Sequence, residues 1–596
     1  MHPALELSNL SKLPYPIRAQ ARAAATGSTE QQLRFVSRRC HIFRQLSLEQ
    51  QPFLLPLFHA VLDPTQIDLI LTELDTSSLD SEKTGEVHYP RILAVLFSLS
   101  AVAALLQNDT VPLAALPDLW ARLWPWMDFL DTYESIFCIP APALESFESR
   151  YLTYVAILRE FRRSNDIMIP WFMCKMLGDV CFVIGKAWRY LIYCRDEAFT
   201  LEHRTALRRI AECLRLYIFD DINQKNTLKK VDQLAFGAGG MRKDLAFLMV
   251  SHLEYFLDFA AQPDPHCQDD TSRSVFSVMT YVCVTAGLFN NKWEDDALQR
   301  ALFECGLVPV VVKILRALNE RSLHANDYQL EGLANFVGAS LSYPPCNACT
   351  ALYLDAGLLP AIFASSNLPH MKTAQKTFAS IIRYAVGPLA TVYHSVLLYC
   401  RIEFPKIAAL EANTLFPDEP SIEEWTGIKT HLEDRLRILH DYESGALDVP
   451  LACNNIKCGS REYSNNEMRR CGGCSLLHYC SKQCQMDDWA AGHRLTCSVL
   501  ASRRYRYLAA RDRSFLRALI YAEYTKVRED LATEDVQQSI LERSGPNNMP
   551  YILFDLATSG GFQTKIAPLE LLPSGFSHEE ARILASIGRV EFQLVR

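Results

Sequence analysis

Apolar residues recur every three or four positions through most of the chain, the spacing that places them on one face of an α-helix. Segments 54–74, 151–163, 203–219 and 243–259 have this pattern, and short breaks rich in Pro, Asn, Asp and Ser separate them. No strand-like alternation of any length interrupts the series between about residue 45 and residue 440. The pattern therefore predicts an all-α region.

Two parts of this region are similar to each other. ALFECGLVPVVVKIL at 301–315 and ALYLDAGLLPAIF at 351–363 each carry a glycine followed by a proline three residues later. A glycine that ends one helix and a proline in the first turn of the next predict a helix-turn-helix unit in both places. The pair resembles armadillo or HEAT repeats, whose period is about 40 residues. An irregular helical domain is the alternative, but both arrangements predict a helical scaffold that presents surface rather than a catalytic cleft.

The chain changes character after residue 404. A linker-like stretch leads to a helix at 422–442 with both signs of charge, which we expect to dock the following segment onto the scaffold. Segments 551–557 and 562–572 predict two strands across a Ser-Gly-Gly turn, followed by a short helix capped by Ser577 and a final strand at 590–595. The C-terminal region is thus predicted to be α+β with one antiparallel sheet.

Seven of the 19 cysteines and one histidine lie between residues 453 and 497 at spacings that suit metal binding. Cys471 and Cys474 flank two glycines, which we expect to form a tight turn with positive φ. Cys480 and Cys484 lie four residues apart and share a face of a helix, as do the last His and Cys. Thiolates with one imidazole favour zinc. The eight candidate ligands are Cys453, Cys458, Cys471, Cys474, Cys480, Cys484, His493 and Cys497.

These eight groups make two complete tetrahedral sets. A disulfide cluster is disfavoured, because a chain of 596 residues with 49% hydrophobic content can bury a core without covalent cross-links. Four protein ligands on each zinc leave no position for water or substrate, so both ions are predicted to be structural. Metal binding would supply most of the folding free energy of this short stretch, on the order of 10 kcal/mol per zinc.

The run RRCGGCSLLHYCSKQCQMDDWAAGHRLTC at 469–497 resembles the MYND zinc finger, and it is most similar to the MYND proteins of mushroom-forming fungi. The resemblance implies that the two ions are bound by alternating pairs of ligands. One ion would take Cys453, Cys458, Cys480 and Cys484, and the other would take Cys471, Cys474, His493 and Cys497. The first pair is C-x4-C where C-x2-C is commoner, so the geometry around Cys453 is the part that the resemblance defines least.

The resemblance also implies a protein-interaction module that binds a short proline-containing peptide in a shallow groove. Gln485 and Trp489 match the positions that line this groove. They lie four residues apart, so on a helix they offer an amide and an aromatic ring on one face. The alternative for Trp489 is that its ring covers the zinc core. We therefore expect a non-enzymatic adaptor whose partner is a protein.

Two other functions were compared with the sequence. Six arginines interleaved with aromatic residues follow the finger and suggest a transcriptional regulator that contacts DNA, although the net charge of -8 disfavours nucleic-acid binding. MYND fingers also occur within SET-domain methyltransferases, but the cofactor and catalytic tyrosine motifs of that class are not found. The arginines are Arg503, Arg504, Arg506, Arg511, Arg513 and Arg517.

The sequence predicts an intracellular location, cytoplasmic or nuclear, because the N-terminus lacks the pattern of a secretory signal. It also predicts four parts along the chain. The most apolar run, 92–106, has 15 residues where a bilayer needs about 20, so we expect a buried helix and no membrane contact. Oligomeric state is not indicated. The parts are a partly flexible segment at 1–45, the scaffold at 46–445, the finger at 450–498 and the α+β region at 499–596.

Overall fold

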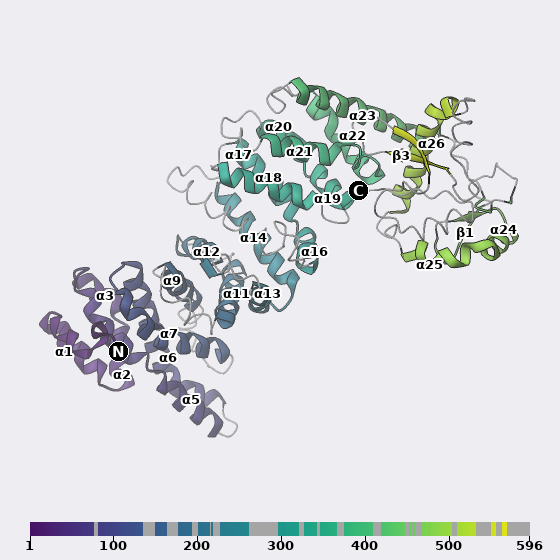
Figure 1. The fold of residues 1–596 in the computed structure, drawn as a ribbon. Helices are drawn as coiled ribbons and strands as arrows, with labels where there is room; N and C mark the ends of the chain where they lie inside the picture. Colours follow the sequence, from purple (N-terminus) through teal and green to yellow (C-terminus); the bar gives the residue numbers. More distant parts are fainter. Residues whose placement is uncertain are drawn as a thin grey trace. The chain divides into compact units, whose positions relative to one another are not determined.

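The structure is a computed structural model of the 596-residue chain. The residues that it describes are 1–76, 81–134, 149–163, 177–193, 201–214, 216–217, 227–260, 296–320, 327–341, 346–365, 375–408, 419–447, 453–455, 457–458, 468–475, 477–502, 509–531, 550–555 and 563–568. Most of these residues are helical (Figure 1), which confirms the predicted mainly α scaffold. Two compact units divide the chain, one formed by residues 1–310 with 321–324 and the other by 311–320 with 325–596.

The first unit is built from helices around a core of aliphatic and aromatic side chains. Short 3-10 helices of the described residues lie among its early α-helices: η1 (Pro3–Leu5), η2 (Leu7–Lys12), η3 (Gln51–Leu54) and η4 (Leu113–Ala115). The α-helices are α1 (Tyr15–Ala25), α2 (Thr29–Val36), α3 (Arg39–Gln45), α4 (Leu55–Val61), α5 (Thr65–Thr76), α6 (Ser81–Gln107), α7 (Leu116–Thr132), α9 (Arg150–Arg163), α11 (Leu177–Tyr193), α12 (Leu201–Leu214), α13 (Thr227–Ala238), α14 (Arg242–Ala260) and α16 (Asp296–Glu304).

Residues 1–45, which we expected to be partly flexible, are helical for most of their length. Leu5, Leu10 and Leu13 are buried, and α1 packs on α4 while α2 packs on α6. Burial of these leucines supplies the stabilisation that orders such a segment. The N-terminal segment and the first scaffold helices therefore share one core.

The apolar helix α6 is longer than the run 92–106 suggested. Its stretch His88–Gln107 has 20 residues, and it and Gln51–Glu73 are long and apolar enough to cross a membrane. A third such span exists if the bent pair Asn347–Asp355 and Leu358–Ser365 is counted as one. More than half of each of the first two stretches is buried inside the protein, because neighbouring helices cover it.

A buried histidine connects two helices of this unit and makes its stability depend on pH. The ring of His252 on α14 lies edge-on to Trp188 on α11, with 5.6 Å between ring centroids. Burial lowers the pKa of His252 to about 3, so it is neutral when folded, whereas an exposed histidine titrates near pH 6.5. Between these values the unfolded chain binds one proton more than the folded chain. The free energy of unfolding therefore falls as the pH drops below about 6.5.

We expect the variant His252→Gln to lose less stability on acidification than the native protein. Each pH unit between about 6.5 and 3 should remove up to about 1.4 kcal/mol through this one proton, or about 2 kcal/mol from neutral pH to pH 5. Urea unfolding of both proteins at pH 7.5 and pH 5 measures the difference. Equal losses in the two proteins would show that His252 does not control this acid sensitivity.

The second unit continues the scaffold and carries the finger. Its α-helices are α17 (Leu307–Asn319, which crosses the boundary between the units), α18 (Asp327–Leu341), α19 (Cys346–Asp355), α20 (Leu358–Ser365), α21 (Gln375–Val386), α22 (His394–Ala408), α23 (Glu419–Ser444), α24 (Lys482–Asp488), α25 (Arg494–Ser502) and α26 (Ala510–Leu531). Antiparallel strands β1 (Arg469–Arg470) and β2 (His478–Tyr479) form one small sheet.

The two similar sequence segments fold alike. Gly306 separates α16 from α17 with φ of 91°, and Gly357 separates α19 from α20 with φ of 83°. Positive φ at these turns is the reason for glycine. Arg316 donates to the carbonyl of Ala356 at 2.8 Å and thereby connects α17 to the second turn. The helix-turn-helix predicted in each copy is thus present.

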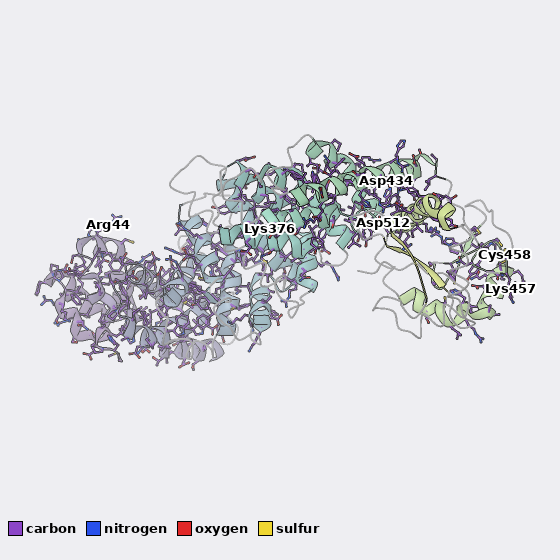
Figure 2. All side chains as sticks on the ribbon, turned by 45° about the horizontal axis from the view of Figure 1, so that its top comes forward. Arg44, Lys376, Asp434, Lys457, Cys458 and Asp512 are labelled. Carbon is purple, nitrogen blue, oxygen red and sulfur yellow. The ribbon has the colours of Figure 1, made fainter. Side chains whose placement is uncertain are left out.

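Helix α26, which follows the finger, packs on α22 and α23, which precede it. Asp512, labelled in Figure 2, lies near the start of α26. Its carboxylate accepts a hydrogen bond of 2.9 Å from the backbone N–H of Ser395 in the first turn of α22. Further along, Glu523 forms an ion pair of 2.7 Å with Arg435 of α23, and both side chains are buried. The finger is therefore inserted between two helices that contact each other.

The predicted C-terminal sheet is present over the described residues. β3 (Pro550–Asp555) pairs antiparallel with β4 (Gln563–Pro568), with Ile552 opposite Ile566. The Ser-Gly-Gly turn, the short helix after Ser577 and the strand expected at 590–595 lie outside the described residues.

Candidate metal centre

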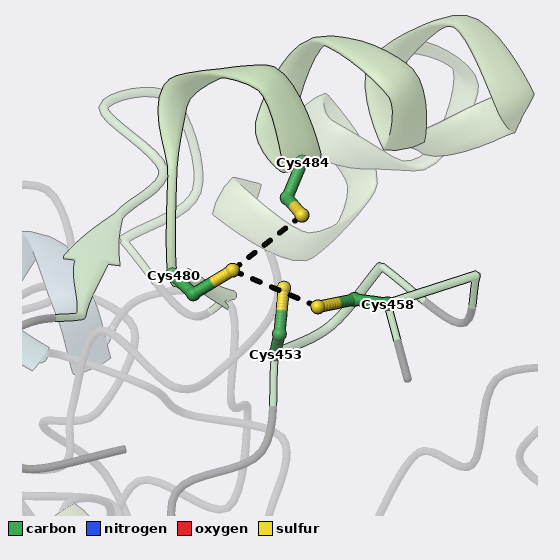
Figure 3. Close-up of side chains that lie close together, drawn as sticks. All are labelled: Cys453, Cys458, Cys480 and Cys484. Atoms are coloured by element: carbon green, nitrogen blue, oxygen red, sulfur yellow. Dashed lines mark hydrogen bonds between the residues drawn. The ribbon is translucent and has the colours of Figure 1, made fainter. Parts of the chain in front are cut away.

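The first ligand set combines a segment before β1 with the start of α24. Cys453 and Cys458 lie on that segment, Cys480 directly follows β2, and Cys484 lies in the first turn of α24. The sulfur of Cys480 is 3.7 Å from that of Cys458 and 3.5 Å from that of Cys484. Figure 3 shows the four sulfur atoms pointing toward one another. All four side chains are half-buried.

Two hydrogen bonds of Asn454 attach this early segment to the sheet. The N–H of Asn454 donates to the carbonyl of His478 at 2.9 Å, and the N–H of His478 donates to the Asn454 side chain at 2.8 Å. Asn454 is the residue after Cys453, so this exchange holds Cys453 beside β2. The geometry around Cys453, which the sequence left least defined, is thus set by a contact with β2.

The second ligand set is buried and combines the turn between β1 and β2 with the last helices of the finger. The sulfur of Cys471 lies 3.2 Å from His493 Nε2 and 3.8 Å from the sulfur of Cys497. Cys474 completes the set, with 3.7 Å between its sulfur and His493 Nε2. The structure therefore brings together the two ligand sets that the resemblance to MYND fingers implied.

The donor atoms fit two tetrahedral zinc ions. Thiolates about 2.3 Å from a common zinc lie about 3.8 Å apart, close to the sulfur separations in both sets. In each set the four donor atoms lie within 4.8 Å of one another. Zinc would be held by four protein groups at each site and would serve a structural role, because no coordination position is left for a substrate.

Gly473 is needed for close packing and not for the positive φ that we expected. We predicted a positive φ for Gly472 and Gly473, but the positive φ in this turn, 58°, belongs to Ser475. A Cβ atom at Gly473 would lie 2.6 Å from the sulfur of Cys497. Glycine is needed because a zinc ligand from the other end of the finger approaches this backbone closely.

A buried hydrogen bond supports the helix between the two sites. Ser481 caps α24 by accepting from the N–H of Cys484 at 3.1 Å, as its position before the helix favours. At the other end, the hydroxyl of Tyr479 donates to Asp488 at 2.5 Å, and both side chains are buried. The role of Asp488 was not predicted, because an acidic residue between exposed helical positions gives no sign of burial.

The two candidate peptide-binding residues lie at this same helix. Gln485 follows Cys484 on α24, and Trp489 begins η10 (Trp489–His493). The Trp489 ring lies edge-on to the ring of His493, 5.4 Å between centroids, yet 44% of the residue is exposed. Trp489 therefore covers part of the second metal site and also presents a solvent-facing surface.

Burial and hydrogen bonds together set the pKa values of the ligand thiols. Burial raises the pKa of Cys453 and of Cys497 to about 12, so these thiols are protonated at neutral pH without a metal. Burial alone would raise the pKa of Cys471. The pKa is nevertheless lowered, because backbone N–H groups of Cys474 and Gly473 donate hydrogen bonds to its sulfur. Zinc binding must displace the remaining protons, and therefore weakens as the pH falls.

The arginines proposed to contact DNA are only partly described. Arg503, Arg504 and Arg506 lie outside the described residues, whereas Arg511, Arg513 and Arg517 lie on α26. Arg511 pairs with Glu443 at 3.7 Å. Burial, followed by the positive charge of Arg470, lowers the pKa of Arg517.

Comparison with known proteins agrees with this geometry. The family model described as "MYND finger" matches residues 453–497. The F-box protein At5g50450 of Arabidopsis thaliana is 37% identical over 62 residues, which are 10% of this chain and 18% of that protein. The F-box protein At1g67340 of the same plant is 39% identical over 46 residues, 8% of this chain and 12% of that protein. No solved structure matches the chain significantly.

The chain thus carries a MYND finger, a zinc-binding module of protein interaction. The alignments span less than a fifth of either curated relative. The similarity to fungal MYND proteins in particular, and the likeness of the helical scaffold to armadillo or HEAT repeats, stay predictions.

Proposed function

We propose that the protein is a non-enzymatic adaptor whose MYND finger captures a short proline-containing peptide of a partner protein. The observation that carries the proposal is the exposed Trp489 ring, which lies against the buried ligand His493. An aromatic ring offers a flat apolar surface on which a proline ring can pack. The side-chain amide of Gln485 can donate hydrogen bonds to the extended peptide backbone and accept hydrogen bonds from it.

The zinc sites explain why such a short stretch can offer a rigid surface. Cys484 immediately precedes Gln485, and Trp489 is four residues before the ligand His493. Gln485 is therefore adjacent to a ligand of the first set, and Trp489 packs against a ligand of the second set. A surface fixed in this way loses little conformational entropy when a peptide binds.

An intracellular location, in the cytoplasm or the nucleus, is part of the proposal. The described cysteines are all free thiols, including buried Cys181, Cys213 and Cys400. A protein that has both free thiols and thiolate metal ligands is typical of a reducing compartment, where cysteines are not oxidised to disulfides.

We expect Trp489→Ala to weaken binding of a proline-containing peptide by about tenfold or more, the usual loss when a central aromatic contact is removed. Gln485→Ala should have a smaller effect in the same direction. Fluorescence polarisation of labelled peptides, first selected on a peptide array with the full chain, measures both affinities.

Gln483→Ala is the matched control, because Gln483 is exposed on the same helix and its position, two residues before Gln485 and six before Trp489, places it off the face that those residues share. Its affinity for the peptide should equal that of the native protein. Equal affinities of the Trp489 and Gln483 variants would refute the assigned binding face. An array on which no proline-containing peptide binds would refute the proposed ligand.

A further inference from the structure

Helix α11 of the scaffold has an unusual outward face. From Val180 onward, its side chains that are not buried are all aromatic or cationic. Except for one adjacent pair they are spaced three or four residues apart, which places them along one stripe of the helix. The solvent side of a scaffold helix normally carries mixed charged and polar residues. The stripe consists of Phe182, Lys186, Arg189, Tyr190 and Tyr193.

Neighbouring helices extend this stripe with two further aromatic rings. Phe236 of α13 lies 6.3 Å from Phe182, and Phe247 of α14 stacks on Tyr193 at 5.8 Å between ring centroids. The exposed fractions are 70% for Phe236, 60% for Tyr193 and 41% for Phe247. Figure 1 shows α11, α13 and α14 packed together in the first unit.

The exposure of these rings follows from very close helix packing. A Cβ atom at Gly185 of α11 would lie 2.4 Å from the carbonyl oxygen of Leu234, and one at Gly237 of α13 would lie 2.0 Å from that of Phe182. The two backbones meet at the glycines, so the larger side chains beside them are displaced to the surface. The helices are thus held rigidly while the aromatic side chains face solvent.

The charge of this surface distinguishes between kinds of partner. Lys186 is already paired, with its Nζ 3.2 Å from Asp131 and 3.7 Å from Glu134. Arg189 has no carboxylate partner among the described residues, and its guanidinium lies 5.8 Å from the centre of the Tyr193 ring. A cation that no described carboxylate neutralises suits a single carboxylate of a partner, whereas a nucleic-acid strand needs several such cations along its backbone.

We propose that the surface formed by Phe182, Arg189, Tyr193, Phe236 and Phe247 is a second docking site, which binds a partner segment with apolar side chains and one carboxylate. Exposed Tyr, Phe and Arg clusters of this kind supply the central contacts of protein interfaces. The carboxylate pairs with Arg189, and the apolar side chains cover the rings of Tyr193, Phe236 and Phe247. This site is independent of the finger, and with it the adaptor can hold two partners.

A charge-reversal experiment tests the proposal. A random peptide display library is selected on the full-length native protein and separately on Arg189→Glu. We expect native protein to select apolar peptides with an Asp or Glu, and Arg189→Glu to select apolar peptides with a Lys or Arg. The double variant Tyr193→Ala/Phe247→Ala should bind the native-selected peptide about tenfold or more weakly, and Trp489→Ala should bind it unchanged.

Unchanged melting temperatures confirm that the variants, all at exposed positions, are folded. Peptides that do not respond to charge reversal, or that lose affinity only in Trp489→Ala, overturn the proposal. Salt-sensitive binding of an oligothymidylate that Arg189→Glu abolishes would assign the surface to nucleic acid instead. A native dimer in light scattering that becomes monomeric in the double variant would assign it to a second copy of this chain.

Discussion

Replacing Cys474 by serine should reduce the zinc content from two ions per chain to one and unfold the second half of the finger. The Cys474 sulfur is buried 3.7 Å from the ligand nitrogen of His493, and a serine hydroxyl is a poor zinc ligand. The site contributes on the order of 10 kcal/mol, far more than the few apolar contacts of this stretch can replace. Elemental analysis of protein purified without added metal gives the zinc content.

The same variant tests the connection between metal and peptide. Since the Trp489 ring rests on His493, loss of the second zinc should also abolish binding of the proline-containing peptide. Cys305→Ser is the matched control, because Cys305 is a free, half-buried cysteine of the scaffold. It should keep two zinc ions and the full affinity. Two zinc ions in the Cys474 variant would contradict the assigned ligand set.

Glu523→Ala should lower the free energy of unfolding by about 3 to 5 kcal/mol, the second large effect. The substitution leaves the buried guanidinium of Arg435 without its partner at 2.7 Å. It also removes one of the ion pairs that join α26 to α23, leaving those of Arg511 with Glu443 and Lys526 with Asp434. The difference between the urea unfolding midpoints of the native protein and the variant measures the change in the free energy of unfolding.

Two controls isolate the buried charge as the cause. Arg437→Ala removes an arginine of α23 that is largely exposed beside Asp434, and should cost less than about 1 kcal/mol. The double variant Arg435→Met/Glu523→Leu removes both charges and should recover much of the lost stability. A Glu523→Ala midpoint equal to that of Arg437→Ala would show that the ion pair does not hold the two helices together.

The metal ligands were predictable because each pair is local. Cys471 and Cys474 share one turn, and Cys480 lies just before the helix whose first turn carries Cys484. Spacing alone does not say which pairs join at one ion, and that assignment came from the resemblance to MYND fingers. The structure groups the same pairs.

The long-range contacts could not be predicted from the sequence. The reason for Gly473 is the sulfur of Cys497, which approaches from another element, and Glu523 meets Arg435 across the whole finger. The apolar periodicity of α11 would also place Phe182 and Tyr193 in a core. Periodicity shows which residues are apolar, but it does not show which face of the helix another helix covers. The outward position of these two side chains depends on the close crossing of α11 and α13.

The zinc content of the unaltered full chain tests the central claim most directly. Protein purified without added zinc should contain two zinc ions per chain and lose both to a strong chelator together with its affinity for the proline-containing peptide. A content of one or none, or peptide binding that persists after the zinc is removed, would contradict the account of a finger built on two metal ions.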